Sequence, residues 1–227
     1  MKSKIVKRIL LFVLSLVVFY GCNNTIDTDD DSNTIHGSGN IVTQSRTVDE
    51  CSGITVKSFG NVYLTQDDNQ SILIEADDNI IDEVIIRKEN GVLFVGLEDG
   101  SYSNVTVKLY VSLKTIESLT INGAGNITTQ NSLTCDNLSL NINGAGNITV
   151  TGSGNYLNSL INGAGNILAK DFIVEKCKAD VNGAGNCTVY VTEELDAVIN
   201  GAGNIYYYGN PSVVRTSISG VGRIIKK

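Results

Sequence analysis

Few residues of this chain could carry out chemistry, and they lie far apart in the sequence. Acidic side chains form adjacent pairs at positions 67–68, 77–78, 82–83 and 193–194. A glycan hydrolase or lyase needs carboxylates that project together from neighbouring segments. Asp77 and Asp78 have no matching acids in the segments that follow, so we interpret both as solvated turn residues. Because His36 is the single histidine, the sequence predicts no catalytic triad, no metal site and no cofactor.

One aromatic cluster, Tyr206-Tyr207-Tyr208, favours contact rather than reaction. Alternate side chains of a strand point to opposite faces, so Tyr206 and Tyr208 would point outward and Tyr207 into the core. Tyrosine provides a large, rigid and amphipathic contact area. We treat Tyr206 and Tyr208, the only outward aromatic pair that this pattern supplies, as a candidate binding surface for a glycan or a protein. The alternative is an exposed strand face without a ligand.

The elements that would position these residues are repeats. The pentapeptide Asn-Gly-Ala-Gly-Asn occurs five times, at intervals of 18 to 21 residues, and a worn copy occupies 219–223. Such periods are typical of solenoids. Apolar residues alternate with other residues on both sides of each turn, which indicates two short strands that each bury one face. The sequence therefore predicts an all-β fold, a single-stranded parallel β-helix or β-solenoid with coils of about 20 residues, right-handed by the general rule for parallel crossovers.

The same pattern of apolar residues around a turn occurs upstream. Ile35 and Ile41, Val56 and Val62, and Ile74 and Ile80 each bracket a turn-like segment, whereas residues 96–115 interrupt the series. We therefore expect one β-solenoid over 35–227, with irregular N-terminal coils over 35–115 and regular coils over 116–227. Together they would make about nine or ten coils.

The asparagines of the pentapeptides should form two polar columns when the coils stack. One column contains Asn122, Asn143, Asn162, Asn182 and Asn200, and the other contains Asn126, Asn147, Asn166, Asn186 and Asn204. Stacked amides can each donate to one neighbour and accept from the other. We interpret both columns as structural turn ladders, and the alternative is that these asparagines bind a ligand.

Cysteine usage leaves the disulfide state open. Cys51, Cys135, Cys177 and Cys187 are an even number, which permits pairing in an exported protein. Cys187 takes the place of a core isoleucine in the repeat, so it suits a small buried hydrophobic residue. Cys135 and Cys177 lie 42 residues apart, which would place them two coils apart in one column and too far apart to bridge. We interpret all four as free core thiols.

Several motifs, in order, resemble a known family. They are Cys51-Ser-Gly-Ile-Thr-Val56, Asn61-Val-Tyr-Leu-Thr-Gln66, Ile72-Leu-Ile-Glu-Ala-Asp77 and Gly91-Val-Leu-Phe-Val95, followed by residues 105–111 and the glycine-rich turns. Over about residues 49–209 the chain resembles the putative auto-transporter adhesins with a head GIN domain, common as lipoproteins of Bacteroidetes-type bacteria. The resemblance implies a β-helix-like fold and a surface or envelope location, and it supplies no catalytic residues.

The N-terminus is typical of an export signal. Four basic residues within 2–8 precede an apolar run from Ile9 to Tyr20, and Gly21-Cys22 follows. Residues 19–22 resemble a bacterial lipobox, so we expect a lipoprotein signal peptide over 1–21 and lipid attachment to Cys22. The acyl chains would anchor the protein to a membrane. Secretion without a lipid is the alternative.

Residues 22–34 are polar and include four aspartates within 27–31, which predicts an acidic flexible tether. The same run resembles the acidic export tag of surface lipoproteins. Asn23 after the lipidated cysteine resembles release to the outer membrane, facing either the cell surface or the periplasm. The net charge of −7 argues against a nucleic-acid partner.

These observations favour a non-enzymatic, adhesin-like binding module anchored at the envelope, with a glycan or protein ligand. A structural envelope spacer without a defined ligand is the alternative. A β-helix enzyme that acts on glycans is a remote third, because the acidic pairs do not converge in the repeat pattern.

Overall fold

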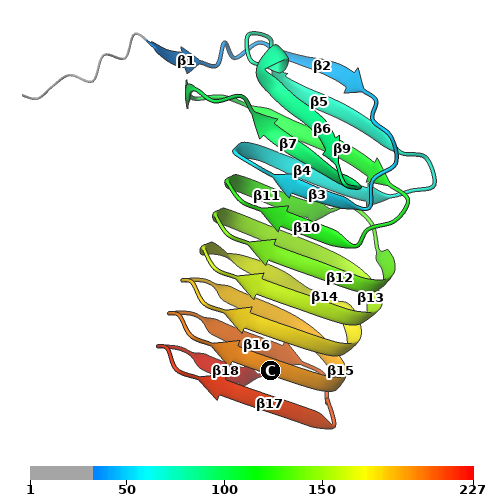
Figure 1. Cartoon of the computed structure of the whole chain (residues 1–227), viewed down its shortest axis with the longest axis vertical. Coiled ribbons are helices and arrows are strands. Elements are labelled where there is room, and N and C mark those ends of the chain that lie inside the picture. Colours follow the sequence, from blue (N-terminus) through cyan, green and yellow to red (C-terminus); the bar gives the residue numbers. More distant parts are fainter. Residues whose placement is uncertain (1–32) are drawn as a thin grey trace, which may run out of the picture. The chain divides into compact units, whose positions relative to one another are not determined.

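The computed structural model of the chain describes residues 33–227 (Figure 1). The expected signal peptide over 1–21, Cys22 and most of the tether over 22–34 lie outside the described residues. Strands account for 69% of the structure, and residues 33–227 contain no α-helix. No helix within that range has the length and hydrophobicity that a bilayer crossing requires.

The strands before the repeats are β1 (Thr34–His36), β2 (Ile41–Arg46), β3 (Gly53–Val56), β4 (Phe59–Gln66), β5 (Ser71–Asp77), β6 (Val84–Glu89), β7 (Val92–Leu97), β8 (Ser101–Ser103) and β9 (Val107–Leu113). A 3-10 turn, η2 (Ile81–Glu83), precedes β6. The strands of the repeat region are β10 (Ser118–Ile121), β11 (Ala124–Thr129), β12 (Leu133–Ile142), β13 (Ala145–Ile161), β14 (Ala164–Val181), β15 (Asn186–Ile199), β16 (Asn204–Tyr208), β17 (Val213–Ile218) and β18 (Arg223–Lys226).

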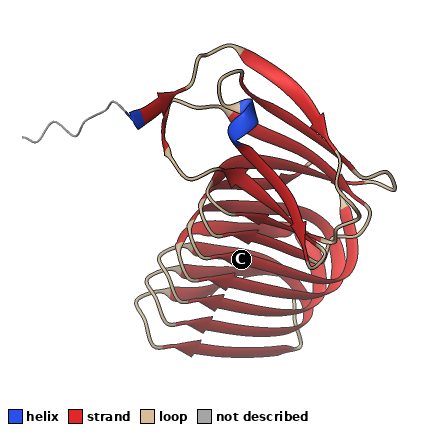
Figure 2. Cartoon of the chain, turned by 45° about the horizontal axis from the view of Figure 1, so that its top comes forward, coloured by secondary structure: helices blue, strands red, loops and turns tan. Residues whose placement is uncertain are grey.

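The repeat region forms the expected parallel solenoid. Equivalent residues of successive repeats are register partners, such as Ile121 with Ile142 and Ile127 with Ile148. Long strands continue around the coil, so β13 pairs with β12 along one part and with β11 along another. The stack makes about five turns, with the glycine-rich turns in a row along one edge (Figures 1 and 2).

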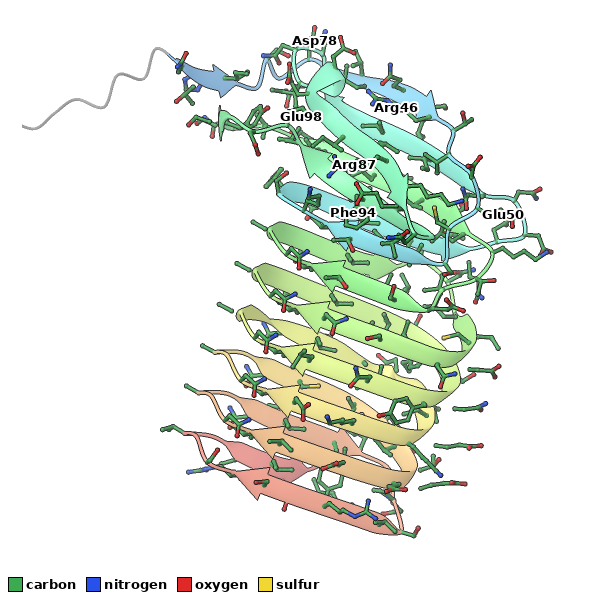
Figure 3. The ribbon with its side chains drawn as sticks, viewed as in Figure 1. Arg46, Glu50, Asp78, Arg87, Phe94 and Glu98 are labelled. Carbon is green, nitrogen blue, oxygen red and sulfur yellow. The ribbon has the colours of Figure 1, made fainter. Side chains whose placement is uncertain are left out.

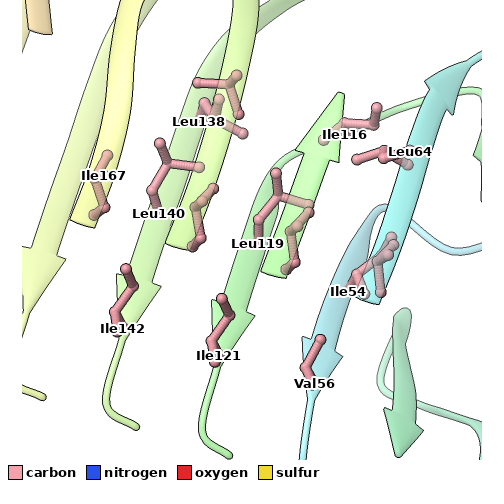
Figure 4. Close-up of a cluster of buried hydrophobic side chains, with 14 of the residues drawn as sticks. Ile54, Val56, Leu64, Ile116, Leu119, Ile121, Leu138, Leu140, Ile142 and Ile167 are labelled. Atoms are coloured by element: carbon pink, nitrogen blue, oxygen red, sulfur yellow. The ribbon is translucent and has the colours of Figure 1, made fainter. Parts of the chain in front are cut away.

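Buried side chains form columns through this stack. In one column Ile54, Leu119 and Leu140 are register partners, and all three are fully buried (Figure 4). The column of Ile127, Ile148, Ile167, Cys187 and Ile205 is also fully buried. Each coil therefore leaves an apolar surface that only the next coil can cover, which is why neighbouring repeats stabilise one another.

Glycine in the turns lets the coils approach closely. A Cβ atom added at Gly144 would lie 2.0 Å from the carbonyl oxygen of Gly123 in the neighbouring coil. The equivalent distance for Gly165, from the carbonyl oxygen of Gly146, is 1.9 Å. Any larger residue would push the turns apart, so the spacing between coils requires glycine at these positions.

The order of the first layers in space differs from their order in the chain. The layer formed by β3 and β4 lies between two other layers. One of these neighbours is formed by β7 and β9, and the other by β10 and β11. The interpretation of residues 96–115 as a break is therefore wrong, because β7 and β9 form a parallel layer beside β3 and β4.

The expectation of nine or ten consecutive coils is also wrong, because β2, β5 and β6 are antiparallel strands. β2 pairs with β5, β5 pairs with β9, and β6 pairs with β7, all antiparallel. We call these three strands the antiparallel cap; Arg46 of β2 and Asp78, just after β5, belong to this end of the stack (Figure 3). The turn-like segment 75–79 lacks glycine, so it cannot form the close turn of the repeats.

Candidate functional site

The first asparagine of each pentapeptide belongs to an exposed ladder. Each Nδ2 donates to the Oδ1 of the preceding coil, at 2.9 Å for Asn143 to Asn122, 2.9 Å for Asn162 to Asn143, 3.0 Å for Asn182 to Asn162 and 2.8 Å for Asn200 to Asn182. Ser219 of the worn copy continues the series by donating to Asn200 at 2.7 Å. These side chains hold one turn to the next.

The second asparagine belongs to a half-buried ladder with more bonds per coil. The Oδ1 of Asn147 accepts from the Nδ2 of Asn166 at 2.9 Å and from its backbone N–H at 3.2 Å. The same pair of bonds recurs for Asn126 with Asn147, Asn166 with Asn186, and Asn186 with Asn204. Because the ladder occupies these amide oxygens, they are poorly placed to contact a ligand.

The structure places Tyr206 and Tyr208 on the outer face of β16, while Tyr207 packs against the core. The two outward tyrosines line an open hollow of about 440 Å³ together with Thr149, Leu168, Lys170, Asp171, Thr188 and Lys227. Thr149, Leu168, Thr188 and Tyr206 belong to one register column. With Lys227 from the coil that follows Tyr206, the hollow crosses five successive coils, and parallel stacking brings together residues up to 78 positions apart.

Charged groups surround this hollow. The Nζ of Lys227 lies 5.1 Å from the centre of the Tyr206 ring, which is a cation–π distance. The Nζ of Lys170 lies 3.8 Å from the carboxylate of Asp171, and both side chains are exposed. The hollow thus combines two phenol rings, threonine hydroxyls and two cations, of which Lys170 has a carboxylate beside it.

A second outward aromatic pair lies on the same face, so the interpretation of Tyr206 and Tyr208 as the only such pair is wrong. Tyr63 and Tyr110 stack with ring centres 5.1 Å apart and planes inclined by 18°. They are register partners on β4 and β9, and Tyr110 is 39% exposed. Sequence reasoning missed the pair because it depends on the altered order of the first layers.

Sequence reasoning also missed a larger hollow, of about 960 Å³. It crosses several layers, and its lining includes Thr134, Asp136, Asn155, Tyr156, Ile173 and Glu175. Ile173 shares a register column with Tyr190 and Tyr208, whereas Tyr156 shares one with Lys176 and Glu194. Tyr156 and Ile173 are exposed there, whereas Phe172 is fully buried beneath Gly154. The run Gly-Ser-Gly at 152–154 was the available signal, because small residues leave a depression.

The four described cysteines are free thiols. Cys187 is fully buried in its isoleucine column, and its Sγ lies 3.1 Å from the Ser159 hydroxyl. The expected common column of Cys135 and Cys177 is wrong, because Cys135 pairs in register with Gly154 whereas Cys177 pairs with Leu157. Burial raises the pKa of Cys187 to about 12 and that of Cys135 to about 11.

Asp77 and Asp78 stabilise the loop that precedes β2 through hydrogen bonds. Asp77 was expected to be solvated, but it is 1% exposed and accepts backbone N–H bonds from Gly39 and Thr106, both at 2.7 Å. Asp78 accepts from Ser38 at 2.6 Å and from Asn40 at 2.8 Å, and these bonds lower the pKa of Asp78. Within residues 33–227 no group of three or more His, Cys, Asp or Glu could hold a metal ion.

Taken together, the stacked parallel coils define a β-solenoid with open hollows on its outer faces. The chain belongs to the family described as "Putative auto-transporter adhesin, head GIN domain", whose model matches residues 50–211. The resemblance found in the sequence is thereby confirmed. The family is adhesin-like, which points to the cell surface.

Solved structures share this fold. A putative adhesin from Bacteroides fragilis NCTC 9343 has 25% identity and a TM-score of 0.71, covering 85% of this chain and 100% of its own. A putative adhesin from Parabacteroides merdae ATCC 43184 has 22% identity and a TM-score of 0.57, covering 86% and 99%. A putative lipid binding protein from Parabacteroides distasonis ATCC 8503 has 23% identity and a TM-score of 0.53, covering 86% and 100%. No curated protein matches the chain.

Proposed function

We propose that this protein is a non-enzymatic, adhesin-like binding module that is held at the outer membrane by a lipid on Cys22 and displayed through the acidic tether over 22–34. The observation that carries the proposal is the hollow of Tyr206 and Tyr208, which crosses five coils on an exposed face. An extended polymer, glycan or protein, could contact several coils there at once. Weak contacts to each coil then add up through multivalency.

Binding is tested by screening the full chain against glycans and matrix proteins, and then by changing the tyrosines. Tyr206→Ser with Tyr208→Ser should leave the melting temperature nearly unchanged and weaken binding at least about tenfold, since aromatic anchors dominate most interfaces. The matched control is Tyr63→Ser with Tyr110→Ser, which removes two tyrosines from the same face. Equal losses of binding affinity in the two double variants would contradict the proposal that the hollow of Tyr206 and Tyr208 binds the ligand.

Anchoring is tested separately with Cys22→Ala. The wild-type protein should partition into the detergent phase of Triton X-114, and the variant should remain in the aqueous phase, because the acyl chains supply the apolar anchor. Identical partitioning of the two proteins would show that Cys22 does not carry the anchor.

A structural spacer remains the second candidate, because the asparagine ladders use the repeated polar groups for internal bonds. It replaces the binding proposal if no glycan, matrix-protein or envelope ligand depends on Tyr206 and Tyr208. A glycan-active enzyme is the third and is tested by a reducing-end assay on bound polysaccharides. We propose no such activity, because the carboxylates of Asp77 and Asp78 hold the loop that precedes β2.

A further inference from the structure

We infer that the hollow of Tyr206 and Tyr208 recognises an acidic polysaccharide, a chain of sugar rings that carry carboxylate or sulfate groups. The inference rests on the proposed function and names the class of ligand for the same surface. Three observations carry it, which are the distribution of charge along the chain, the position of Lys227 and the mixed lining of the hollow.

Positive charge is concentrated in the last coil. Residues 213–227 contain Arg215, Arg223, Lys226 and Lys227 and no acidic residue, although the whole chain has a net charge of −7. Arg215 forms an ion pair with Glu194, and the Nζ of Lys226 donates to Asn210 at 2.7 Å. Within residues 33–227, neither Arg223 nor Lys227 takes part in an ion pair. Their charges are available to an anionic partner.

Lys227 places one of these charges at the tyrosines. Its Nζ lies 5.1 Å from the centre of the Tyr206 ring, at the hollow that Tyr208 also lines. Lys170 adds a second cation across the hollow, although Asp171 beside it offsets part of that charge. A carboxylate or sulfate on a sugar ring that packs against Tyr206 would therefore lie beside the ammonium group of Lys227. Charge-assisted bonds of this kind are stronger than neutral ones.

The rest of the lining suits sugars. Tyrosine offers a flat apolar face with a polar tip, and the hydroxyls of Thr149 and Thr188 can bond to sugar hydroxyls. A nucleic acid has a much denser charge, one per about 1.7 Å of duplex axis, and needs a long basic track. The column that leads away from the hollow consists of Thr128 and Tyr63 rather than cations, and the net charge of the chain is negative. These features favour a polymer with about one charge per ring.

The test immobilises the full chain and measures binding of polygalacturonate at several salt concentrations. Two matched probes accompany it: the fully methyl-esterified polymer, which keeps the rings and loses the charge, and polyglutamate, which keeps carboxylates without rings. Polygalacturonate should bind at least about tenfold more tightly than either, and more weakly as salt rises. Lys227→Glu should weaken binding at least about tenfold, whereas Lys226→Glu, with the same charge change one residue away, should leave it within about twofold.

Each other result overturns the inference. Equal binding of the esterified polymer would show a neutral glycan site, which leaves the proposed function intact. Equal binding of polyglutamate, equal losses for the two lysine variants, or tighter binding of oligothymidylate would show general attraction to anions or a nucleic-acid site. If none of the probes binds but another ligand depends on Tyr206, only this inference fails. If no ligand depends on the tyrosines, the proposed function fails with it.

Discussion

At the residue scale, glycine sets the distance between coils. Gly165 stacks on Gly146, and a Cβ atom added to Gly165 would lie 1.9 Å from the carbonyl oxygen of Gly146. Because that neighbour is backbone, the clash cannot be relieved by a rotamer change. Gly165→Ala should lower the free energy of unfolding by about 3 kcal/mol, as measured by urea denaturation. Ala164→Ser, at the exposed neighbouring position, should change it by less than about 0.5 kcal/mol. Equal effects of the two changes would contradict close turn stacking.

The two asparagine ladders should differ in strength. Asn166→Ala removes one bond to Asn147 and two bonds from Asn186 at a half-buried position, so we expect a loss of about 2 kcal/mol. Asn162→Ala removes two bonds at an exposed position, where water replaces them, and should cost about 0.5 kcal/mol. Urea denaturation measures the free energy of unfolding of both variants, and the comparison holds if their m-values are equal. The reverse order would show that the half-buried ladder is not the stronger one.

The buried thiols predict a pH dependence. Thiolate is the reactive form, and burial raises the pKa of Cys135 to about 11 and that of Cys187 to about 12. In the native protein Cys135 should react slowly with Ellman's reagent at pH 8 and faster as the pH approaches 11, while Cys187 should react only after unfolding. In the unfolded chain these thiols lose their protons near pH 9, at lower pH than in the folded protein. The two groups therefore lower the free energy of unfolding as the pH rises from about 9 toward about 12. Peptide mapping assigns each thiol, and rapid labelling of native Cys187 at pH 8 would contradict the packing.

At the element scale, the buried column that contains Ile167 should be required for cooperative folding. Ile167 is 0% exposed in the middle of the stack, and its neighbour Leu168 is 42% exposed on the outer face. Ile167→Asp would bury an unpaired charge and should abolish the cooperative thermal transition seen by circular dichroism. Leu168→Asp should keep that transition. A cooperative transition in Ile167→Asp would contradict the parallel register around this residue.

Much of the repeat region could be predicted because its pattern is local. The apolar residues that flank each pentapeptide indicated both the alternation and the register, and the structure stacks Ile121 on Ile142 as expected. The order of the first layers could not be predicted, because β4 and β9 both alternate like solenoid strands and only long-range pairing decides which layers are neighbours. The antiparallel direction of β5 has no local mark either, since Ile72 and Ile74 suit both directions. The handedness stays a prediction.

At the scale of the whole molecule, one end of the stack is closed by the antiparallel cap and the other ends at the basic coil of residues 213–227. The outward position of Tyr206 and Tyr208 could be predicted from strand alternation alone. Thr149 and Leu168 each follow the flanking residue of their repeat, so their shared column with Tyr206 could also be predicted. Lys170 could not be assigned to the hollow, because the register shifts just after Thr149. The larger hollow had only the Gly-Ser-Gly run at 152–154 as a local mark, because its lining comes from several layers.

The central proposal is recognition by the outer face at the basic end of the stack. Hydroxyl-radical footprinting of the full chain with bound polygalacturonate tests this proposal most directly. Tyr206, Tyr208 and Leu168 should each lose reactivity when the polymer binds, because it would cover the hollow that they line. Tyr156, which lines the larger hollow in a different register column, should remain unchanged. Protection of Tyr156 instead, with Tyr206 and Tyr208 still reactive, would contradict this proposal.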